Sequence, residues 1–215
     1  KKSFSEPLNT WNSNTFGTLS LLDSLRKIKR NIAVVLITSD KSYKNLELDR
    51  GYTENDLLGG DDPYSGSKGA TEILINSYIK SFFNNNSKVL ISVARAGNVI
   101  GGGDWSSDRL IPDCVKSWSK DKKVLIRNPN STRPWQHVIE VLYGYMLLAL
   151  KLKKNKRLHG EAFNFGPSLT NKLRVIDIVK KMRSNWKEVN WKIVKGKKSF
   201  KESKLLQLNS KKSKK

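Results

Sequence analysis

Hydrophobic and polar positions alternate along this chain in the manner of an α/β protein. Apolar residues recur at helical spacing over 8–28, and the β-branched apolar segment "NIAVVLIT" follows at 31–38. A short apolar run bounded by polar residues is typical of a strand buried on both faces of a parallel sheet. A polar loop at 39–63, a helix at 64–83 and a second buried strand at 87–95 then repeat the pattern. We therefore predict an α/β fold with a largely parallel, Rossmann-like doubly wound sheet.

Shorter elements continue this alternation in the second half of the chain. After a glycine-rich loop at 96–105, the pattern predicts helices at 109–118, 137–152 and 174–186, and strands at 123–126, 162–166 and 189–195. The apolar stripe of 142–150 lies at helical spacing, so we assign it, with Met146, Trp118 and Trp186, to the core. Cys114 is likewise expected to be a small buried side chain.

The start of a doubly wound sheet is not visible in this sequence. Sheets that hold a dinucleotide usually carry a glycine-rich turn after the first strand, and no G-x-G-x-x-G occurs in the chain. The chain also begins just before a helix and ends in a lysine run. We therefore expect a truncated domain that lacks its first strands, with an unpaired sheet edge.

Charge is the most conspicuous feature of the composition. The formal net charge is +22, with lysine clusters at 151–157, at 195–201 and at the C-terminal end. Such a charge raises the question of nucleic-acid binding, but the lysines are scattered and no zinc finger or RNA-stacking motif accompanies them. A solvated lysine-rich surface is therefore favoured over a nucleic-acid partner, and an anionic small-molecule substrate also fits.

Location and metal binding are constrained by what the sequence lacks. The longest apolar run, at 32–37, is far too short to span a membrane. A single cysteine, Cys114, allows no internal disulfide, and no His/Cys cluster has metal-ligand spacing. We expect a cytoplasmic protein without a metal site and without a membrane partner.

Tyr64 and Lys68 form the first candidate for chemistry. A lysine four residues after a tyrosine is usually an exposed helix neighbour, so the spacing alone is weak evidence. Here the pair opens a predicted helix behind Pro63 and follows a polar loop that starts where a buried strand ends. Open α/β sheets place their sites at the carboxyl ends of strands. On one helix face, the ammonium can lower the pKa of the phenol and make it a general base.

Five segments resemble one enzyme family in their order and spacing. The chain is similar to the nucleotide-sugar 4,6-dehydratases of the extended short-chain dehydrogenase/reductase family, and most of all to the branch that acts on CDP-glucose. The resemblance rests on "TSDKSY", "GGDDPYSGSKGATE", "ARAGNVIGGGDW", "STRPWQHV" and "AFNFGP". By the same comparison, roughly the first 80 to 100 residues of the usual domain, with its pyrophosphate-binding turn, are missing.

The resemblance implies an NAD-dependent redox cycle on the sugar. Tyr64 would take the O4 proton while hydride leaves C4 for NAD, Ser39 would hydrogen-bond the same O4, and Lys68 would hold the nicotinamide ribose. Asp40 would protonate the departing C6 hydroxyl after loss of the C5 proton, and hydride would return to C6. Lys41 stands where relatives acting on TDP-glucose have Glu. We assign Lys41 to the C5 step, which requires a depressed pKa.

The resemblance also assigns substrate contacts and a division of the chain. Asn98, Arg109, Arg133 and His137 would bind the nucleotide sugar; arginines suit a diphosphate because guanidinium offers paired donors. For His137, a polar residue at a helix start is an equally good interpretation. Residues 1–97 would be a partial NAD-binding Rossmann domain. Residues 98–215 would complete the sheet and form a smaller nucleotide-sugar-binding subdomain.

A partner and two competing functions complete the predictions. In the family, the helices at 8–28 and 64–83 pair with their copies in a homodimer through a four-helix bundle. One alternative is another nucleotide-sugar dehydratase or an epimerase of the same fold. The other is a basic polyanion- or nucleic-acid-binding domain without catalysis, whose binding would weaken steeply with added salt.

Overall fold

A parallel sheet forms the centre of the larger part of the molecule. The structure is a computed structural model that describes residues 2–84, 87–106, 108–168, 173–186, 189–194 and 205–215. Its main sheet has the order β1-β2-β6, with β1 at Ile32–Ile37, β2 at Val89–Ala96 and β6 at Ala162–Phe165. Both pairings are parallel. β2 is buried along its whole length, as expected of a central strand. The predicted parallel α/β fold is confirmed.

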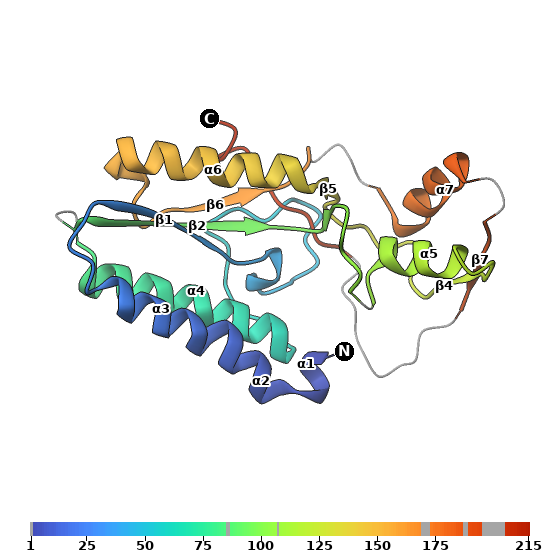
Figure 1. Ribbon diagram of the computed structural model, residues 1–215, viewed down its shortest axis with the longest axis horizontal. Coiled ribbons are helices and arrows are strands. Elements are labelled where there is room, and N and C mark those ends of the chain that lie inside the picture. Colours follow the sequence, from blue (N-terminus) through green and yellow to red (C-terminus); the bar gives the residue numbers. More distant parts are fainter. Residues whose placement is uncertain (1, 85–86, 107, 169–172, 187–188, 195–204) are drawn as a thin grey trace.

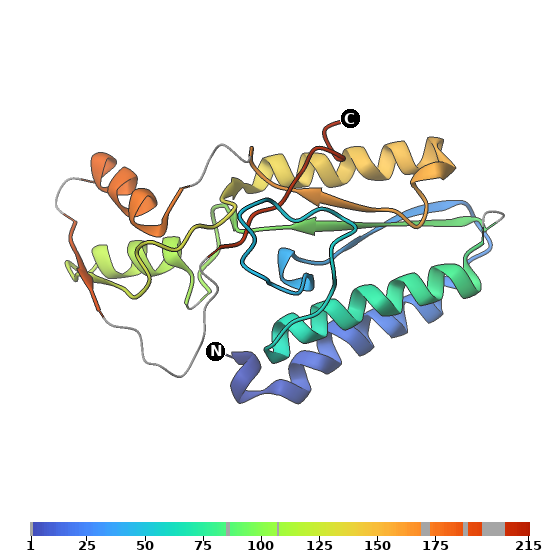
Figure 2. The ribbon, with the colours of Figure 1, turned by 180° about the vertical axis from the view of Figure 1, so that it is seen from behind.

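Helices cover both faces of this sheet. Figures 1 and 2 show α3 (Gly17–Leu25) and α4 (Pro63–Phe82) on one face and α6 (Val138–Lys154) on the other. A core cluster that includes Leu22, Ile75 and Ile91 joins the sheet to α3 and α4. Ala94, Leu148 and Phe163 form a second cluster under α6. Burial of apolar area on both faces is the main force that holds these layers together.

The helix predicted at 8–28 occurs as a series of helical segments. α1 (Lys2–Ser5) and α2 (Pro7–Trp11) lead into a π-helical turn at Asn12–Phe16, and α3 then ends at Leu25. The π-helical turn lies against α4, where Asn14 Nδ2 donates to Ser67 Oγ at 2.9 Å. Single π-helical turns are rare and often lie near functional sites.

A smaller lobe contains α5 and α7. It comprises α5 (Leu110–Trp118), β4 (Val124–Ile126), α7 (Val175–Asn185) and β7 (Trp191–Ile193), with β4 and β7 paired in parallel (Figure 1). Its own core contains Cys114, Trp118 and Val179 among its buried members. Each of these elements agrees with the sequence-based prediction to within a few residues.

Short elements that the sequence did not reveal connect the two parts. β3 (Val99–Ile100) lies in the segment expected to be a loop and pairs in parallel with β5 (Gln136–His137). 3-10 helices occur at Asp40–Ser42, called η2 here, and at Lys156–Leu158. Strands of two residues carry too little periodicity to be recognised in a sequence.

The core assignment was partly wrong. Leu148 and Trp118 are buried as expected, but Tyr143 is 63%, Met146 61% and Trp186 39% exposed. The C-terminal end, in which the sequence shows only a lysine run, places Leu206 and Leu208 in a buried cluster with Tyr43 and Tyr52. Segment 205–215 is thus part of the fold. The lysine cluster at 195–201 lies outside the described residues.

The described residues contain neither a candidate membrane-spanning helix nor a candidate metal-binding cluster. None of the helices in this part of the chain has the length and apolar character needed to cross a membrane. Within the same described ranges, no group of three or more His, Cys, Asp or Glu residues could hold a metal ion.

Candidate functional site

The start of α4 fixes the position of Tyr64. Asp62 is the N-cap, and its Oδ1 accepts hydrogen bonds from the backbone N–H groups of Tyr64 at 2.9 Å and Ser65 at 3.1 Å. Pro63 occupies the first helical position, where its missing N–H costs no hydrogen bond. Tyr64 therefore lies in the first turn, and Lys68 follows one turn later with its Nζ 5.8 Å from the centre of the Tyr64 ring.

A tight turn after β1 brings three more candidates to the same place. Ser39 caps η2 and accepts a hydrogen bond from the backbone N–H of Lys41 at 3.2 Å. Its hydroxyl donates to Asp40 Oδ1 at 3.0 Å. The Ser39 side chain also lies close enough to the Tyr64 phenol to lower the pKa of that phenol. Residues 39–41 and the start of α4 therefore meet, as the sequence predicted from the carboxyl end of the strand.

Asp40 is a buried carboxyl group with an unused oxygen. Only 4% of the residue is exposed, and its Oδ2 has no hydrogen-bond partner in the described part of the chain. Burial raises the pKa of Asp40, because the charged form is poorly solvated there. The charges of Lys41 and Arg133 and the hydrogen bond from Ser39 oppose that rise in pKa. Such a carboxyl group is suited to holding and donating a proton.

The electrostatics of Tyr64 differ from the prediction. Burial raises the pKa of its phenol, and the main opposing contributions come from the Ser39 side chain and the Arg109 charge. Lys68, predicted to lower this pKa, is not among the largest contributors to it. Burial lowers the pKa of Lys68 itself, and the charge of Glu72 opposes this.

The Lys68 ammonium group is available to a ligand. Within the described residues it donates no hydrogen bond, although the side chain is only partly exposed. An ammonium group offers three N–H donors. Lys68 could therefore bind ligand hydroxyl groups at this end of the sheet.

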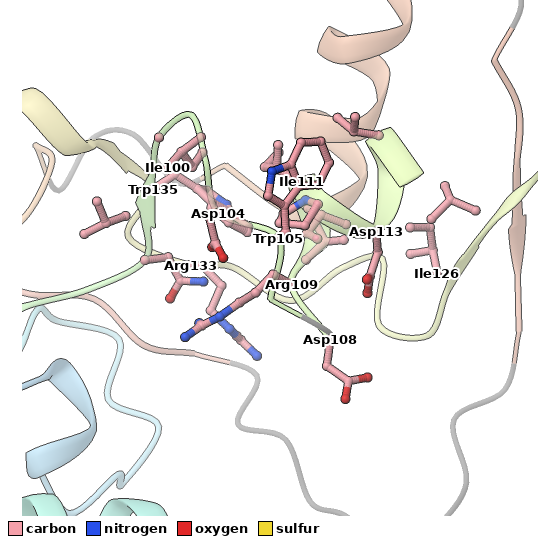
Figure 3. A pocket seen from close by; sticks show the side chains of 18 of the residues that line it. Ile100, Asp104, Trp105, Asp108, Arg109, Ile111, Asp113, Ile126, Arg133 and Trp135 are labelled. Carbon is pink, nitrogen blue, oxygen red and sulfur yellow. The ribbon is translucent and has the colours of Figure 1, made fainter. Parts of the chain in front are cut away.

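A cavity of about 520 Å³ opens beside this cluster, between β3, the loop that follows it and the smaller lobe. Its lining includes Trp105, Arg109, Arg133 and Trp135 (Figure 3). Figure 3 shows Arg109 and Arg133 extending from its wall toward the side on which η2 and α4 lie. Because Arg133 affects the pKa of Asp40 and Arg109 affects that of Tyr64, both guanidinium charges act on the η2–α4 cluster. The two arginines therefore connect the cavity wall electrostatically with the η2–α4 cluster, although none of the cluster residues Ser39, Asp40, Lys41, Tyr64 and Lys68 is among the lining residues.

The remaining predicted contacts, Asn98 and His137, also line the cavity. Asn98 accepts a backbone hydrogen bond from Gln136 N at 3.0 Å, which joins the strands on either side. His137 is the N-cap of α6, where its Nδ1 accepts from Ile139 N at 3.2 Å. The structure therefore gives His137 a helix-capping role and a place on the cavity wall.

A close approach at Gly97 joins the end of β2 to this cavity. A Cβ atom at Gly97 would lie 2.2 Å from Pro134 Cγ and 3.3 Å from the Pro134 carbonyl oxygen. No real Cβ contact is that short, so only glycine allows the chain before Asn98 to pass so near to Arg133.

Several residues of the site were missed by the sequence analysis. Trp105 is 60% exposed at the cavity, and Trp135 has a buried Nε1–H without a partner in the described residues. Glu72 and Arg95 form a buried ion pair behind the cluster. A signal for this pair was present: Glu72 lies four residues after Lys68, and Arg95 is the one charged residue in the apolar segment "VLISVARA".

Comparisons with known proteins give a consistent result. The sequence matches the family described as GDP-mannose 4,6 dehydratase over residues 1–214. It is 45% identical over 188 residues to a CDP-glucose 4,6-dehydratase of Salmonella typhimurium, covering 86% of this chain and 52% of that protein. It is 26% identical over 204 residues to a UDP-glucose 4-epimerase of Mycoplasma genitalium, covering 84% and 56%.

A solved structure shows the same fold. The crystal structure of dTDP-glucose 4,6-dehydratase from Bacillus anthracis in complex with NAD superposes with a TM-score of 0.77 at 22% identity, over 95% of this chain and 61% of that one. The chain thus spans about half the length of the curated relatives it matches. Because the family match extends over almost every residue, this chain belongs to the GDP-mannose 4,6 dehydratase family.

Proposed function

We propose that this chain forms part of an NAD-dependent CDP-glucose 4,6-dehydratase, a hydro-lyase that makes CDP-4-dehydro-6-deoxyglucose. The observation that carries the proposal is the 45% identity to a protein of that name over 86% of the chain. The geometry supports it, because a phenol, a hydroxyl group and a buried carboxyl group converge beside a cavity of suitable chemistry. Ser39, Asp40, Lys41, Tyr64 and Lys68 are the proposed catalytic residues.

In this proposal the phenol acts on the sugar O4. Tyr64 accepts the O4 proton as the C4 hydride departs, and Ser39 hydrogen-bonds the same oxygen. The closeness of Ser39 to the Tyr64 phenol supports this arrangement, since one substrate oxygen can reach both groups. NAD, when bound, would supply the hydride-transfer chemistry that this cycle needs, beside the phenol of Tyr64 and the hydroxyl of Ser39.

The turn after β1 would carry out the elimination. Once C4 is a ketone, the C5 proton is acidic, and Lys41 in its neutral form removes it. Asp40 donates its proton to the departing C6 hydroxyl, which leaves as water, and the protonated Lys41 would return a proton to C5 when C6 receives hydride. The raised pKa of Asp40 supports this role, because a carboxyl group must hold a proton near neutral pH to act as an acid.

The residues present fit the nicotinamide half of the cofactor. Lys68 has free N–H donors for ribose hydroxyls and lies at the carboxyl end of parallel strands, where dinucleotides bind in sheets of this kind. Tyr64 and Ser39 would contact the same part of the cofactor. Residues that would hold the pyrophosphate are not recognisable in this sequence, which has no G-x-G-x-x-G.

The cavity would hold the nucleotide diphosphate. Arg109 and Arg133 suit its paired oxygens, and Asn98 and His137 line the same space. The high positive charge of the chain would favour capture of such an anion. The proposed division follows: residues 1–97 contribute to cofactor binding and residues 98–215 to substrate binding.

An assay of the complete natural polypeptide that contains this chain tests the proposal. The protein is incubated with NAD and CDP-glucose, alkali is added, and the absorbance of the 4-keto-6-deoxy product is read. We expect product with CDP-glucose and much less with the UDP-, TDP- and GDP-sugars. Conversion of a UDP-sugar to its 4-epimer would instead support the epimerase alternative. An absence of turnover with every sugar, together with binding of polyanions that weakens steeply with salt, would support the non-catalytic alternative.

We also propose a cytoplasmic homodimer that pairs through α3 and α4. Exposed apolar side chains on these helices support it: Leu21, Ile73 and Phe82 are 46–60% exposed. Two copies of a helix pair would bury such side chains in a four-helix bundle. Light scattering should show a dimer for the wild type and a monomer for Ile73→Lys, with Lys80→Ala on α4 as the control.

A further inference from the structure

A buried ion pair lies behind the proposed catalytic groups. Arg95 Nε donates to Glu72 Oε1 and Arg95 Nη2 to Glu72 Oε2, both at 2.8 Å. Each side chain is at most 5% exposed. A buried ion pair usually gives little net stability, because the cost of removing both charges from water offsets their attraction. Net stability therefore does not explain why Glu72 and Arg95 are buried together, whereas their hydrogen bonds to neighbouring segments can.

The pair is bonded to both ends of the turn that carries Ser39, Asp40 and Lys41. Thr38, the residue before the turn, donates its hydroxyl hydrogen to Glu72 Oε1. Tyr43, the residue after the turn, shares a hydrogen bond of 2.8 Å between its hydroxyl oxygen and Arg95 Nη1. Thr38 and Tyr43 are 9% and 2% exposed. The turn is thus held at its beginning and at its end by one ion pair.

The same pair is attached to α4 and to the neighbouring strands. Glu72 lies one helical turn after Lys68, and its charge raises the pKa of Lys68 against the effect of burial. Arg95 belongs to β2, and the Tyr43 hydroxyl donates to Asn164 Oδ1 in β6 at 2.7 Å. Movement of the turn relative to α4 would break charge-assisted hydrogen bonds in a buried place, which is costly.

We propose that Glu72 and Arg95 are positioning residues that hold the Ser39–Lys41 turn in register with Tyr64 and Lys68. Neither residue contacts the substrate. The inference rests on the proposed function, because it concerns the distances between the Ser39–Lys41 turn and Tyr64 that the proposed reaction requires. A shift of about 1 Å between reacting groups can cost about 100-fold in rate.

Paired variants of Thr38 in the complete natural polypeptide give the first test. Thr38→Val keeps the shape and removes the hydroxyl donor to Glu72, whereas Thr38→Ser keeps the donor and removes a methyl group. We expect kcat to fall about 10- to 100-fold in Thr38→Val, with KM for CDP-glucose within about twofold of wild type, and Thr38→Ser to retain most of the rate. Equal losses in both variants, or a change in KM alone, would overturn the proposal.

Glu72→Gln separates charge from position. It also lowers kcat, and in addition it moves the limb of the pH–rate profile that belongs to Lys68 to lower pH, because burial then acts on the ammonium unopposed. Thr38→Val leaves that limb in place. Asp177→Asn, in the more exposed ion pair of α7, is the control that leaves kcat unchanged. All rates are taken well below each variant's Tm, so that a loss of stability alone moves none of them.

A crystallographic readout keeps this inference separate from the proposed function. If the wild type does not turn over CDP-glucose, the proposed function fails, but the distance between Ser39 Oγ and the Tyr64 hydroxyl can still be compared in wild type and Thr38→Val crystals. The proposal requires this distance to differ from the wild-type value by about 1 Å or more in the variant. An unchanged distance would overturn it.

Discussion

Ser39, Asp40 and Tyr64 are largely enclosed by protein, whereas Arg109 and Trp105 on the wall of the neighbouring cavity are exposed. The first group, here the turn side, is fixed by caps, a short helical turn and hydrogen bonds between side chains. The second group, called the cavity side here, consists mainly of long side chains from residues 98–137. A rigid buried arrangement suits chemistry, which depends on distances, and an open charged wall suits capture of an anionic ligand.

The comparison predicts that changes on the turn side lower kcat and that changes on the cavity side raise KM. A mutation that removes an interaction made only in the transition state lowers kcat. A mutation that removes an interaction made equally in the bound ground state and in the transition state raises KM. Kinetics of variants in the complete natural polypeptide can therefore separate the two sides.

The largest effect is expected from Tyr64→Phe. Removal of the hydroxyl leaves the ring packed and eliminates the proposed base, so kcat should fall by about 10³- to 10⁴-fold with little change in stability. The alkali-absorbance assay measures it. Tyr143→Phe, on the exposed face of α6, is the matched control and should behave like wild type. Residual activity of Tyr64→Phe within about tenfold of wild type would exclude Tyr64 as the base.

Asp40→Asn should separate activity from stability. We expect kcat to fall about 100-fold, because the amide cannot donate the required proton. Burial raises the pKa of Asp40, so the folded protein holds this proton more tightly than the unfolded chain does. The free energy of unfolding of the wild type therefore falls as pH rises above the ordinary range for Asp.

The stability of Asp40→Asn then has a defined dependence on pH. The variant should melt at higher temperature than wild type near pH 7, and the difference should shrink as the pH falls to about 3, below the ordinary pKa of Asp, where the carboxyl group is mostly protonated in both states. Thermal unfolding at the two pH values checks this. A lower Tm for the variant at pH 7 would contradict the assignment of Asp40 as a protonated, buried acid.

Arg133→Ala tests the cavity side. Loss of a charge-assisted contact to a diphosphate should raise KM for CDP-glucose about 10- to 100-fold and change kcat less. Because Arg133 lowers the pKa of Asp40, its removal should also shift the Asp40-dependent limb of the pH–rate profile to higher pH. Arg183→Ala, on the smaller lobe away from the cavity lining, provides the control for loss of one positive charge.

The smallest effect is expected where the two sides meet. Gly97→Ala would place a methyl group 2.2 Å from Pro134 Cγ, so the 133–134 segment must shift. We expect a loss of about 1–3 kcal/mol in the free energy of unfolding and a rise in KM of a few-fold. Gly102→Ala, whose added Cβ would meet nothing within 4 Å, is the matched control. Equal stability of the two variants would show that the close approach is not needed.

Local signals accounted for much of this structure. The apolar strands at 31–38 and 87–95 and the helix that begins at Pro63 were predicted because their patterns and caps act within a few residues. The meeting of Ser39, Asp40 and Tyr64 followed from the rule that strands of a parallel sheet end at one edge. Long-range partners carried no such signal, as the burial of Leu206 and Leu208 against Tyr43 and Tyr52 shows.

The exposed face of α6 shows a related limit. Apolar residues at helical spacing predict that one side of a helix is covered, but they do not say by what. In the described chain Leu148 and Leu152 face the sheet, while Met146 and Tyr143 lie on the exposed side. Both sides of α6 are apolar, so periodicity could not identify the side that packs.

By itself, the sequence determined the order of strands and helices, the capped start of α4 and the residue types that could act on a sugar. Each of these depends on neighbours along the chain. The tertiary structure decided which side of each helix is covered, and that Thr38, Glu72, Arg95 and Tyr43 share one hydrogen-bond network. These four residues lie on three separate segments, and burial removes the water that would otherwise satisfy them. Only the folded path of the chain brings their partners within bonding distance.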